Sequence, residues 1–487
     1  MASSDYLIYR PEEVGFFDLL CLCLVKSRLS DCKFVESSHR KFVESSLSLG
    51  SKLEDESAIA NWILGFTLII QKILLRLDVP LRILGFIIEF SLNLLSLNGG
   101  FLRLVFRIIT FSVVIPVQDT ENYRSYIGHL DGRLDLYKTL WFLNYLPQMR
   151  TLNTSNDVSL MDLTMLAAEV AYENEAYVRN AVKHWKLINP NQLTSDLCLS
   201  EFEKEFGTRA YIFCDRSVDA NLIVVSFRGT ETFDAKDWMA DFDLSWIRMG
   251  KMGRAHLGFM KVLGIQDEKD YLKGWPKDYQ GEKPLAYYSI RDTLKILLQV
   301  HENAKIVVTG HSLGGALAAI FPSILILHDE ATILNRFACV LTYGQPRVGD
   351  ETFGSFIEAW LQNSGLQQFY YRVVYRYDLV PRVPFDDPYS QFKHFGCCIY
   401  FSSWYKGQRM KEEPDKNFFY IEYLASKYFN ACKDLITSLL LSKTQGEDFK
   451  ESGACIMYRI KGLLCPGVGC HNPRDYLNAI RLGKITR

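Results

Sequence analysis

The chain has almost no net charge, and this near-balance of acidic and basic residues limits the partners it can have. Its 487 residues include 55 lysines and arginines against 56 aspartates and glutamates, a formal net charge of -1 at pH 7. General binding to nucleic acid requires an excess of positive charge that neutralises phosphates. The composition therefore argues against nucleic acid as a partner. At this length, a catalytic domain with an accessory region is the expected organisation.

A secretory signal is also missing from the pattern of the first residues. The first apolar stretch, residues 15–25, follows the acidic pair Glu12 and Glu13 rather than a basic region, and Asp18 interrupts it. These features make it a poor signal peptide. We therefore expect the protein to face the cytosol.

The twelve cysteines lack the spacing that a metal site needs. Cys455, Cys465, Cys470 and His471 lie close together in the sequence, but they contain no CxxC pair. We expect free thiols and no metal, which fits a reducing location.

The most apolar part of the chain, residues 57–118, contains no uncharged run long enough to cross a bilayer as one helix. Its longest such run, residues 57–71, has 15 residues, whereas a single crossing needs roughly 20. Five basic and two acidic residues leave the stretch at +3. Some basic residues are spaced four apart, on one helical face. These pairs are Lys72 with Arg76 and Arg103 with Arg107.

This stretch is expected to form helices that break at Pro80 and at Gly99-Gly100. Helices that are apolar on one side and sparsely basic on the other favour the plane of a lipid surface, with the basic residues at the headgroups. Two alternatives remain open. The helices would pack on the globular domain, or they would form a re-entrant or spanning hairpin.

The rest of the chain divides into a polar segment (1–56), a connecting segment (119–158) and an α/β domain (159–487). Within that domain, helical periodicity predicts a helix over 159–174. β-Branched and aromatic runs predict buried strands at 221–227, 304–309, 337–343 and 370–375. Strands that alternate with helices predict a largely parallel or mixed sheet, with active loops at the carboxyl ends of the strands.

A Gly-x-Ser-x-Gly motif at 310–314 follows the second of these strands. Small, helix-forming residues come directly after it, as in the nucleophile elbow of an α/β-hydrolase. Gly310 and Gly314 are needed because the tight turn leaves no room for Cβ atoms. Ser312 is therefore the candidate nucleophile, and an inert serine in a glycine-rich turn is the alternative. Pro322 is expected to interrupt the helix that follows.

A serine nucleophile needs an acid and a base, which in this fold follow it in that order along the chain. Asp378 lies three residues beyond the predicted strand 370–375 and is the candidate acid. Asp386 and Asp387 are competitors, but they lie beyond two prolines and resemble solvent-facing turn residues.

Two histidines follow the strand 370–375. His394 is only 16 residues from Asp378, and we expect it to be a structural histidine bonded to the backbone. His471 lies in a loop rich in turn residues that would place an imidazole over the edge of the sheet. It is the candidate general base.

An oxyanion hole needs two backbone N–H donors. Leu313, directly after the candidate nucleophile, supplies one. Thr230, in the loop after the strand 221–227, supplies the other. The next stretch, 231–244, alternates acidic with apolar residues and predicts a short amphipathic helix, either a lid or an ordinary surface helix.

From about residue 160 to 487 the chain resembles the class 3 (fungal-type) lipases. Several motifs carry this resemblance: FRGT at 227–230, Asp237-Trp238, HLGF at 256–259, GHSLGGALA at 310–318, YGQPRVG at 343–349 and DLVP at 378–381. The apolar stretch and the motif HNPRDY at 471–476 are most similar to the plant oil-body lipases, which are triacylglycerol lipases bound to lipid droplets.

The resemblance implies an α/β-hydrolase fold with an N-terminal apolar region that associates with lipid. It also implies Ser312 as nucleophile, Asp378 as acid and His471 as base, with Thr230 and Leu313 at the oxyanion. Catalysis would proceed through an acyl-enzyme without cofactor or metal. The role of a charged, helical insertion at about 411–450 is not settled by it.

The expected substrates are triacylglycerols, with di- and monoacylglycerols, at the droplet surface facing the cytosol or at the endoplasmic reticulum membrane. A phospholipase A1 or galactolipase shares this machinery and is the nearest alternative. A catalytically inactive, lipase-like interaction protein is the second.

Overall fold

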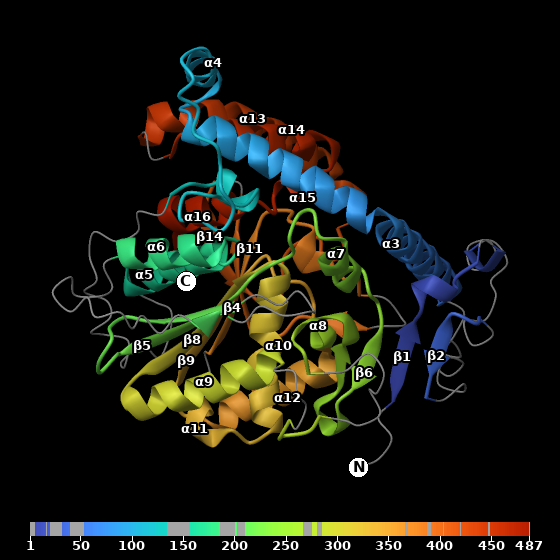
Figure 1. Cartoon of the computed structure of the whole chain (residues 1–487). Helices are drawn as coiled ribbons and strands as arrows, with labels where there is room; N and C mark the ends of the chain where they lie inside the picture. The colour runs from blue at the N-terminus through green and yellow to red at the C-terminus, as the bar shows by residue number, and fades with distance from the viewer. Residues whose placement is uncertain are drawn as a thin grey trace.

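A nine-stranded sheet forms the centre of the molecule, in the order β15-β14-β13-β11-β9-β8-β5-β4-β3 (Figure 1). The computed structural model describes residues 5–15, 17–19, 32–38, 53–133, 155–185, 200–201, 210–265, 275–279, 285–365, 369–386, 391–402, 404–418, 420–446 and 449–486. The strands of this sheet are β3 (Ser200–Glu201), β4 (Ala210–Cys214), β5 (Leu222–Phe227), β8 (Lys305–His311), β9 (Phe337–Tyr343), β11 (Tyr370–Tyr375), β13 (Cys397–Phe401), β14 (Lys406–Met410) and β15 (Lys484–Thr486).

Neighbouring strands run parallel from β5 through β8, β9 and β11 to β13. The strand β4 is antiparallel to both of its neighbours, whereas β14 is antiparallel to β13 and parallel to β15. The predicted mixed, largely parallel sheet is therefore confirmed. All four predicted strands are present, and two of them, 337–343 and 370–375, have the predicted ends.

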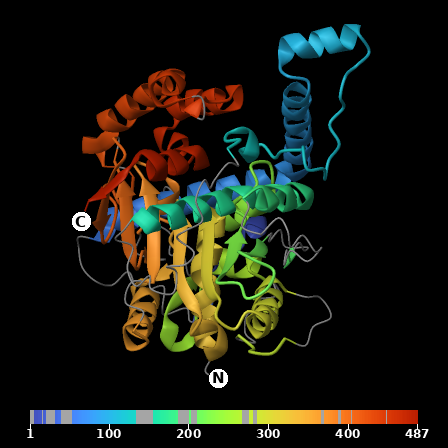
Figure 2. The ribbon, with the colours of Figure 1, turned by 90° about the vertical axis from the view of Figure 1, so that its left-hand side faces the viewer.

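Helices cover both faces of this sheet (Figures 1 and 2). Successive strand residues point to opposite faces, so Val224 and Val307 enter one core while Val225 and Val308 enter the other. One face carries α5 (Ser155–Val170), α6 (Glu175–His184) and α16 (Pro473–Leu482). The other carries α8 (Leu257–Val262), α9 (Ala286–Val300), α10 (Leu313–Leu327), α11 (Ala331–Leu334) and α12 (Glu351–Asn363).

The helix α10 runs through Pro322, so the predicted interruption is wrong. A proline inside a helix removes a single backbone hydrogen bond, and here the surrounding side chains of α10 are buried in the core. Packing therefore outweighs the local preference.

A second, antiparallel sheet has six strands in the order β12-β10-β7-β6-β1-β2. Two of them come from the polar N-terminal segment, which thus forms part of the fold. The strands are β1 (Tyr6–Tyr9), β2 (Val35–Ser37), β6 (Trp246–Arg248), β7 (Arg254–His256), β10 (Gly349–Asp350) and β12 (Phe392–Lys393). Short 3-10 turns are η1 (Pro11–Glu13), η3 (Ile127–His129), η6 (Gly250–Met252), η8 (Val380–Arg382) and η9 (Ile421–Tyr423).

The apolar stretch forms two helices, α3 (Leu53–Leu97) and α4 (Phe101–Ile109). The predicted break at Gly99-Gly100 is confirmed, and both glycines have positive φ angles. The predicted break at Pro80 is wrong, because α3 continues through it. Pro80 is exposed, so the lost hydrogen bond leaves no polar group in the core. Within the described residues, no helix has both the length and the hydropathy that crossing a membrane requires.

The first part of α3 packs on the protein, as one of the alternatives expected. Leu64 and Leu68 lie in a buried cluster with Trp246, and Lys72 donates a hydrogen bond to the carbonyl of Val14. Lys72 is thus bound to the protein and does not reach a headgroup. The first part of α3 also exposes Trp62 and Phe66, and the second part of α3 (from Val79 onward) and α4 expose further large apolar side chains. These include Val79, Ile83, Leu84, Phe86, Ile87, Phe101, Leu102, Phe106, Ile108 and Ile109.

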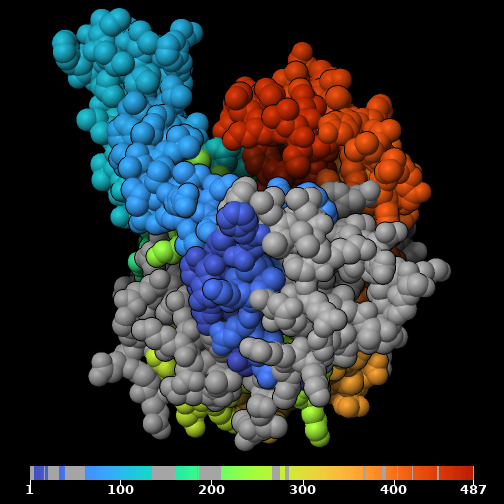
Figure 3. All heavy atoms as spheres, turned by 90° about the vertical axis from the view of Figure 1, so that its right-hand side faces the viewer, coloured from blue at the N-terminus to red at the C-terminus, as the bar shows by residue number. Residues whose placement is uncertain are grey.

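Beyond the sheet, the chain forms α13 (Leu424–Gln445), α14 (Gly453–Leu464) and α15 (Pro466–Gly469). The helices α13 and α14 lie at the same end of the molecule as α3 and α4 (Figures 1 and 2). Figure 3 shows the two groups as separate ridges. A cavity of about 950 Å³ lies between them, lined by Ile88 and Leu92 of α3 and by Ala454 and Met457 of α14.

Candidate active site

Ser312 lies at the turn between β8 and α10, with φ 60° and ψ -131°. L-residues rarely adopt this conformation, which costs about 1–3 kcal/mol. The amide of Ser312 donates to the carbonyl of Tyr343 at 2.9 Å. A Cβ atom on Gly310 would lie 2.2 Å from the backbone of Gly314, and one on Gly314 would lie 2.2 Å from the carbonyl of Phe227. The strand, turn and helix predicted for the motif are therefore present, for the predicted steric reason.

The structure brings Asp378 and His471 together. Nδ1 of His471 lies 2.7 Å from Oδ2 of Asp378. Asp378 follows the carboxyl end of β11, and its Oδ1 accepts a hydrogen bond from the amide of Val380 at 2.9 Å. His471 lies in the turn between α15 and α16. The side chain of Asp378 is fully buried, and these two partners fix its orientation.

Tyr476 is a third partner of this carboxylate that sequence reasoning missed. Its hydroxyl donates to Oδ2 of Asp378 at 2.5 Å. Burial, followed by the negative charge of Asp378, raises the pKa of Tyr476 well above its usual value, so the hydroxyl keeps its proton. The residue belongs to the motif at 471–476, but its role depends on α16 folding back over β11.

His471 lies beside the turn that holds Ser312. Its ring stacks on that of His311, with 4.5 Å between centroids. Gly344 follows Tyr343, and a Cβ atom there would lie only 2.8 Å from Cε1 of His471. Nε2 of His471 is buried and has no hydrogen-bond partner in the part of the chain that the structure describes. Nε2 of His471 therefore makes no hydrogen bond to Oγ of Ser312 here, so the structure joins the predicted base to the predicted acid but not to the predicted nucleophile.

The ring of His311, which stacks on His471, is itself held by Tyr172. Nδ1 of His311 lies 2.9 Å from the hydroxyl of Tyr172. Burial, and then the neighbouring His471, lowers the pKa of His311 well below its usual value. A neutral ring in this place adds no positive charge against the base. A Cβ atom on Gly229 would lie 1.9 Å from the Tyr172 hydroxyl, so this loop also requires glycine.

The two predicted oxyanion residues lie at the ends of β5 and β8. Leu313 is the first residue of α10, whose first amides have no acceptor within the helix. The hydroxyl of Thr230 donates to Oδ2 of Asp241 at 2.5 Å. Burial raises the pKa of Asp241 to about 8, although the bond from Thr230 opposes the shift. The stretch 231–244 forms only a short helix, α7 (Ala235–Asp241).

The loop of Thr230 is also held by charge. A buried ion pair joins Arg228 to Asp237 of α7, with 3.0 Å between nitrogen and oxygen. Burial raises the pKa of Asp237 to about 6, against the lowering effect of Arg228.

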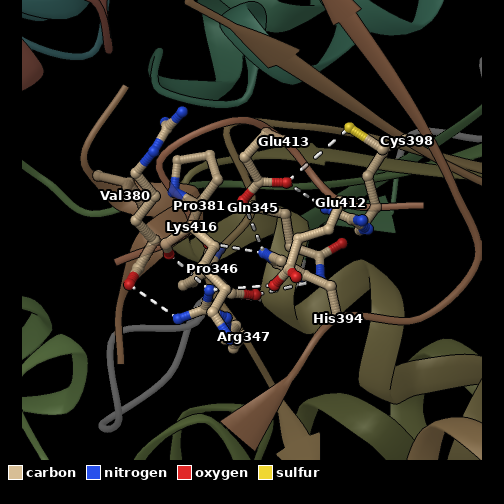
Figure 4. Close-up of polar contacts among 12 residues, drawn as sticks. Gln345, Pro346, Arg347, Val380, Pro381, His394, Cys398, Glu412, Glu413 and Lys416 are labelled. Carbon is tan, nitrogen blue, oxygen red and sulfur yellow. Dashed lines mark hydrogen bonds and ion pairs between the residues drawn. The ribbon is translucent and has the colours of Figure 1, made fainter. Parts of the chain in front are cut away.

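The structure separates the two histidines as predicted. Nε2 of His394 lies 2.6 Å from the carbonyl of Pro381 and 3.6 Å from Oε1 of Glu413, in a buried polar cluster (Figure 4). Burial, and then the charge of Arg372, lowers the pKa of His394 well below its usual value. This is a structural histidine.

The expectation for Asp386 needs correction. Instead of facing solvent in a turn, it accepts hydrogen bonds from Lys393 at 2.8 Å and Lys416 at 2.9 Å. Both lysines lower the pKa of Asp386, although burial opposes them. Asp387 lies outside the described residues.

The chain is similar to a family model, to several curated proteins and to several solved structures. A family model described as Lipase (class 3) matches residues 224–387. Two plant proteins named Triacylglycerol lipase OBL1 match 99% of this chain and 95% of their own length. The Arabidopsis thaliana protein is 38% identical and the Nicotiana tabacum protein 37% identical. A lipase structure from Rhizopus microsporus var. chinensis is 21% identical, covers 51% of this chain and 75% of its own, and gives a TM-score of 0.37. The chain belongs to the class 3 lipase family.

Proposed function

We propose that this chain is a serine lipase that hydrolyses acylglycerols, above all triacylglycerols, through an acyl-enzyme intermediate. The pairing of His471 with Asp378 beside the strained turn of Ser312 carries the proposal. Support also comes from the relatives that match the whole chain, since both are named triacylglycerol lipases.

In the first half of the reaction, Oγ of Ser312 attacks the ester carbonyl, and Nε2 of His471 takes the serine proton. Asp378 holds the imidazole in the orientation that leaves Nε2 available. The amides of Leu313 and Thr230 stabilise the oxyanion of the tetrahedral intermediate. His471 then gives the proton to the departing glyceride alkoxide, which leaves an acyl group on Ser312.

In the second half, water replaces the alcohol. His471 takes a proton from the water molecule as it attacks the acyl-enzyme, and returns that proton to Oγ of Ser312 when the fatty acid leaves. The hydrogen bond from Tyr476 keeps the carboxylate of Asp378 in place in both halves.

The proposed site of action is the surface of a lipid droplet, facing the cytosol. Triacylglycerol does not dissolve in water, so the enzyme must work at the surface of an oil phase. The exposed apolar side chains of α4 and of the second part of α3 suit insertion under phospholipid headgroups. They lie at the same end of the molecule as α15 and α16, which flank the turn of His471 (Figure 1).

Replacement of the nucleophile tests the proposal. Ser312→Ala should lower turnover of emulsified triacylglycerol by about 10⁴-fold or more and abolish labelling by a fluorophosphonate. Ser323→Ala is the matched control, because Ser323 of α10 is buried, as Ser312 is, and within the described residues its hydroxyl bonds only to the carbonyl of Ala319. Phosphatidylcholine and galactolipid are assayed beside triacylglycerol. Faster hydrolysis of either would favour the phospholipase or galactolipase alternative.

A further inference from the structure

The helix α13 has its polarity reversed with respect to a normal surface helix. Every exposed residue between positions 424 and 440 is apolar, aromatic or cysteine. They recur at helical spacing and so form one face. The outer face consists of Leu424, Ala425, Tyr428, Phe429, Cys432, Ile436, Leu439 and Leu440. By contrast, Lys427, Asn430 and Ser438 of the same helix are each only 4% exposed.

The buried polar side of α13 is already occupied by the protein. Asp434 forms an ion pair with Arg376, two residues before Asp378. The hydroxyl of Tyr377 donates to Oγ of Ser426 at 3.0 Å. The helix therefore rests its polar side on the loop of the catalytic acid.

A second ion pair holds the buried side of α13 against the protein. Nζ of Lys427 lies 2.5 Å from Oδ2 of Asp415, in the segment that leads into the helix. Rotation of α13 that turned its apolar face inward would leave these charges without partners, which is costly. The outward position of the apolar face is thus fixed by the fold.

We propose that the outer face of α13 is a docking surface for the acyl phase of a lipid surface, separate from α3 and α4. This inference rests on the proposed function for the identity of the lipid. Two observations favour lipid. Apart from the hydroxyl of Tyr428 and the thiol of Cys432, the face offers no side-chain group that could hydrogen-bond to a protein partner. The face also lies at the same end of the molecule as α4 (Figures 1 and 3). The neighbouring α14 adds exposed Met457 and Leu464.

The edge of this surface is cationic. Nζ of Lys433 lies 3.4 Å from the ring centre of Trp404, which is itself exposed. Lys443 lies exposed in the last turn of α13. An aromatic residue beside a lysine at the edge of an apolar face is the arrangement expected where headgroups meet acyl chains.

A flotation experiment with the full chain tests the inference. Droplets of triolein coated with phosphatidylcholine are mixed with the wild type or with Phe429→Gln/Ile436→Gln. Loss of two large apolar contacts should lower partition onto droplets about tenfold or more. The control is Ile296→Gln/Val300→Gln in α9. Its side chains are equally exposed (61% and 55%, against 69% and 61%) but lie at the opposite end of the molecule (Figure 1).

The control pair should float like the wild type, and both pairs should keep activity on a short soluble ester. Unchanged flotation of the α13 pair would overturn the inference. It would also be overturned if light scattering showed a wild-type dimer that the α13 pair converts to monomer while flotation stays the same. In that case a second copy of the chain covers the face.

Hydrolysis of triolein is measured in parallel, so the two proposals fail separately. If the wild type floats in a way that depends on α13 but does not cleave triolein, the proposed function fails and the docking surface stands. If the wild type cleaves triolein and the α13 pair floats normally, only the docking surface fails. A wild type that does not float at all refutes the docking surface.

Discussion

At the scale of single residues, Gly344 is the point where the backbone touches both members of the acid–base pair. Its φ angle of 57° lies in the left-handed region. A Cβ atom there would lie 2.8 Å from Cε1 of His471 and 3.0 Å from Oδ2 of Asp378. The glycine therefore provides space as well as backbone freedom, and the two needs can be separated by experiment.

Gly344→Ala should push the His471 ring away from Ser312 and lower kcat/KM on a soluble ester by about 10- to 100-fold, since a shift of about 1 Å can cost that much. The control is Gly365→Ala, because Gly365 has a similar φ of 71° but nothing within 4 Å of its Cβ position. Gly365→Ala should lose only the stability that the left-handed backbone costs an alanine, about 1 kcal/mol, and Gly344→Ala should lose more because of the contacts of its Cβ atom. Equal loss of kcat/KM in the control would show that backbone strain, not contact with His471, explains the effect.

Residue types and spacing were enough to predict the pairing of Asp378 with His471 and the strained turn at Ser312, because each follows a strand or a turn that the sequence indicates. The role of the three residues as one catalytic group stays a prediction. Residue types and spacing were not enough for Tyr476, His311 or Tyr172. These three act through contacts in space between elements far apart in the chain. No local pattern distinguishes a tyrosine that bonds to a catalytic carboxylate from one that fills a core.

At the scale of elements, the side chain of Asn98 joins the two ends of the segment that contains α4. The amide group of Asn98 donates to the carbonyl of Val114 at 2.8 Å and accepts from its N–H at 2.9 Å. Asn98 is fully buried. The segment between these two residues can therefore be shortened without opening the rest of the fold.

Replacement of residues 102–111 by a short glycine linker should keep activity on a soluble ester and reduce flotation on triolein droplets. Deletion of all of 57–118 should instead abolish both activity and flotation. It removes Leu64 and Leu68 from a buried cluster, and it removes the Glu89 carboxylate that accepts a hydrogen bond from the amide of Tyr126. Activity on the soluble ester and thermal melting distinguish the two variants. Normal flotation of the shorter deletion would show that α4 does not anchor the protein.

The predicted helix breaks at proline were wrong, because the local preference of proline did not decide where these helices end. Pro80 and Pro322 both lie inside continuous helices, although proline disfavours that position. The strands were predicted well because apolar runs buried on both faces leave a plain signal. The helix α13 lies within the stretch at 411–450 that the sequence predicted to be charged and helical, but its reversed polarity was not predicted, since only the fold shows which side faces outward.

At the scale of the whole molecule, a buried polar cluster joins the insertion to the lipase core (Figure 4). The guanidinium of Arg372 lies 3.3 Å from Glu413, and both side chains are buried. Arg382 donates to the carbonyl of Asp415 at 2.8 Å and also to that of Asp378. The segment before α13 and the loop of the catalytic acid are thus held by the same arginine.

Although burial opposes it, His394 and then the arginines lower the pKa of Glu413 to about 2. A carboxylate whose folded pKa is depressed stabilises the protein above its unfolded pKa of 4.5, and this stability is lost as pH falls towards 2. Glu413→Gln should therefore cost about 3–5 kcal/mol at pH 7. The difference from wild type should shrink as pH is lowered from 5 to 3, as followed by thermal melting.

Glu412→Gln is the control for this prediction. Glu412 pairs with Arg347 at the same distance of 3.3 Å, but its side chain is 33% exposed. An ion pair open to water contributes about 1 kcal/mol or less. Equal destabilisation by both variants, or a Glu413→Gln difference that does not change with pH, would contradict the account.

The same cluster bears on how such a protein can change over evolution. Arg347, Arg372 and Arg382 all lie within the residues that match the family model, and each has a partner beyond it, between 412 and 416. Arg347 and Arg382 also bond to carbonyl groups within the matched residues. A chain that lost residues 412–416 would leave the three buried guanidinium groups with fewer partners and Arg372 without the carboxylate of Glu413, which is costly. We therefore expect these arginines and the segment before α13 to change together in related chains.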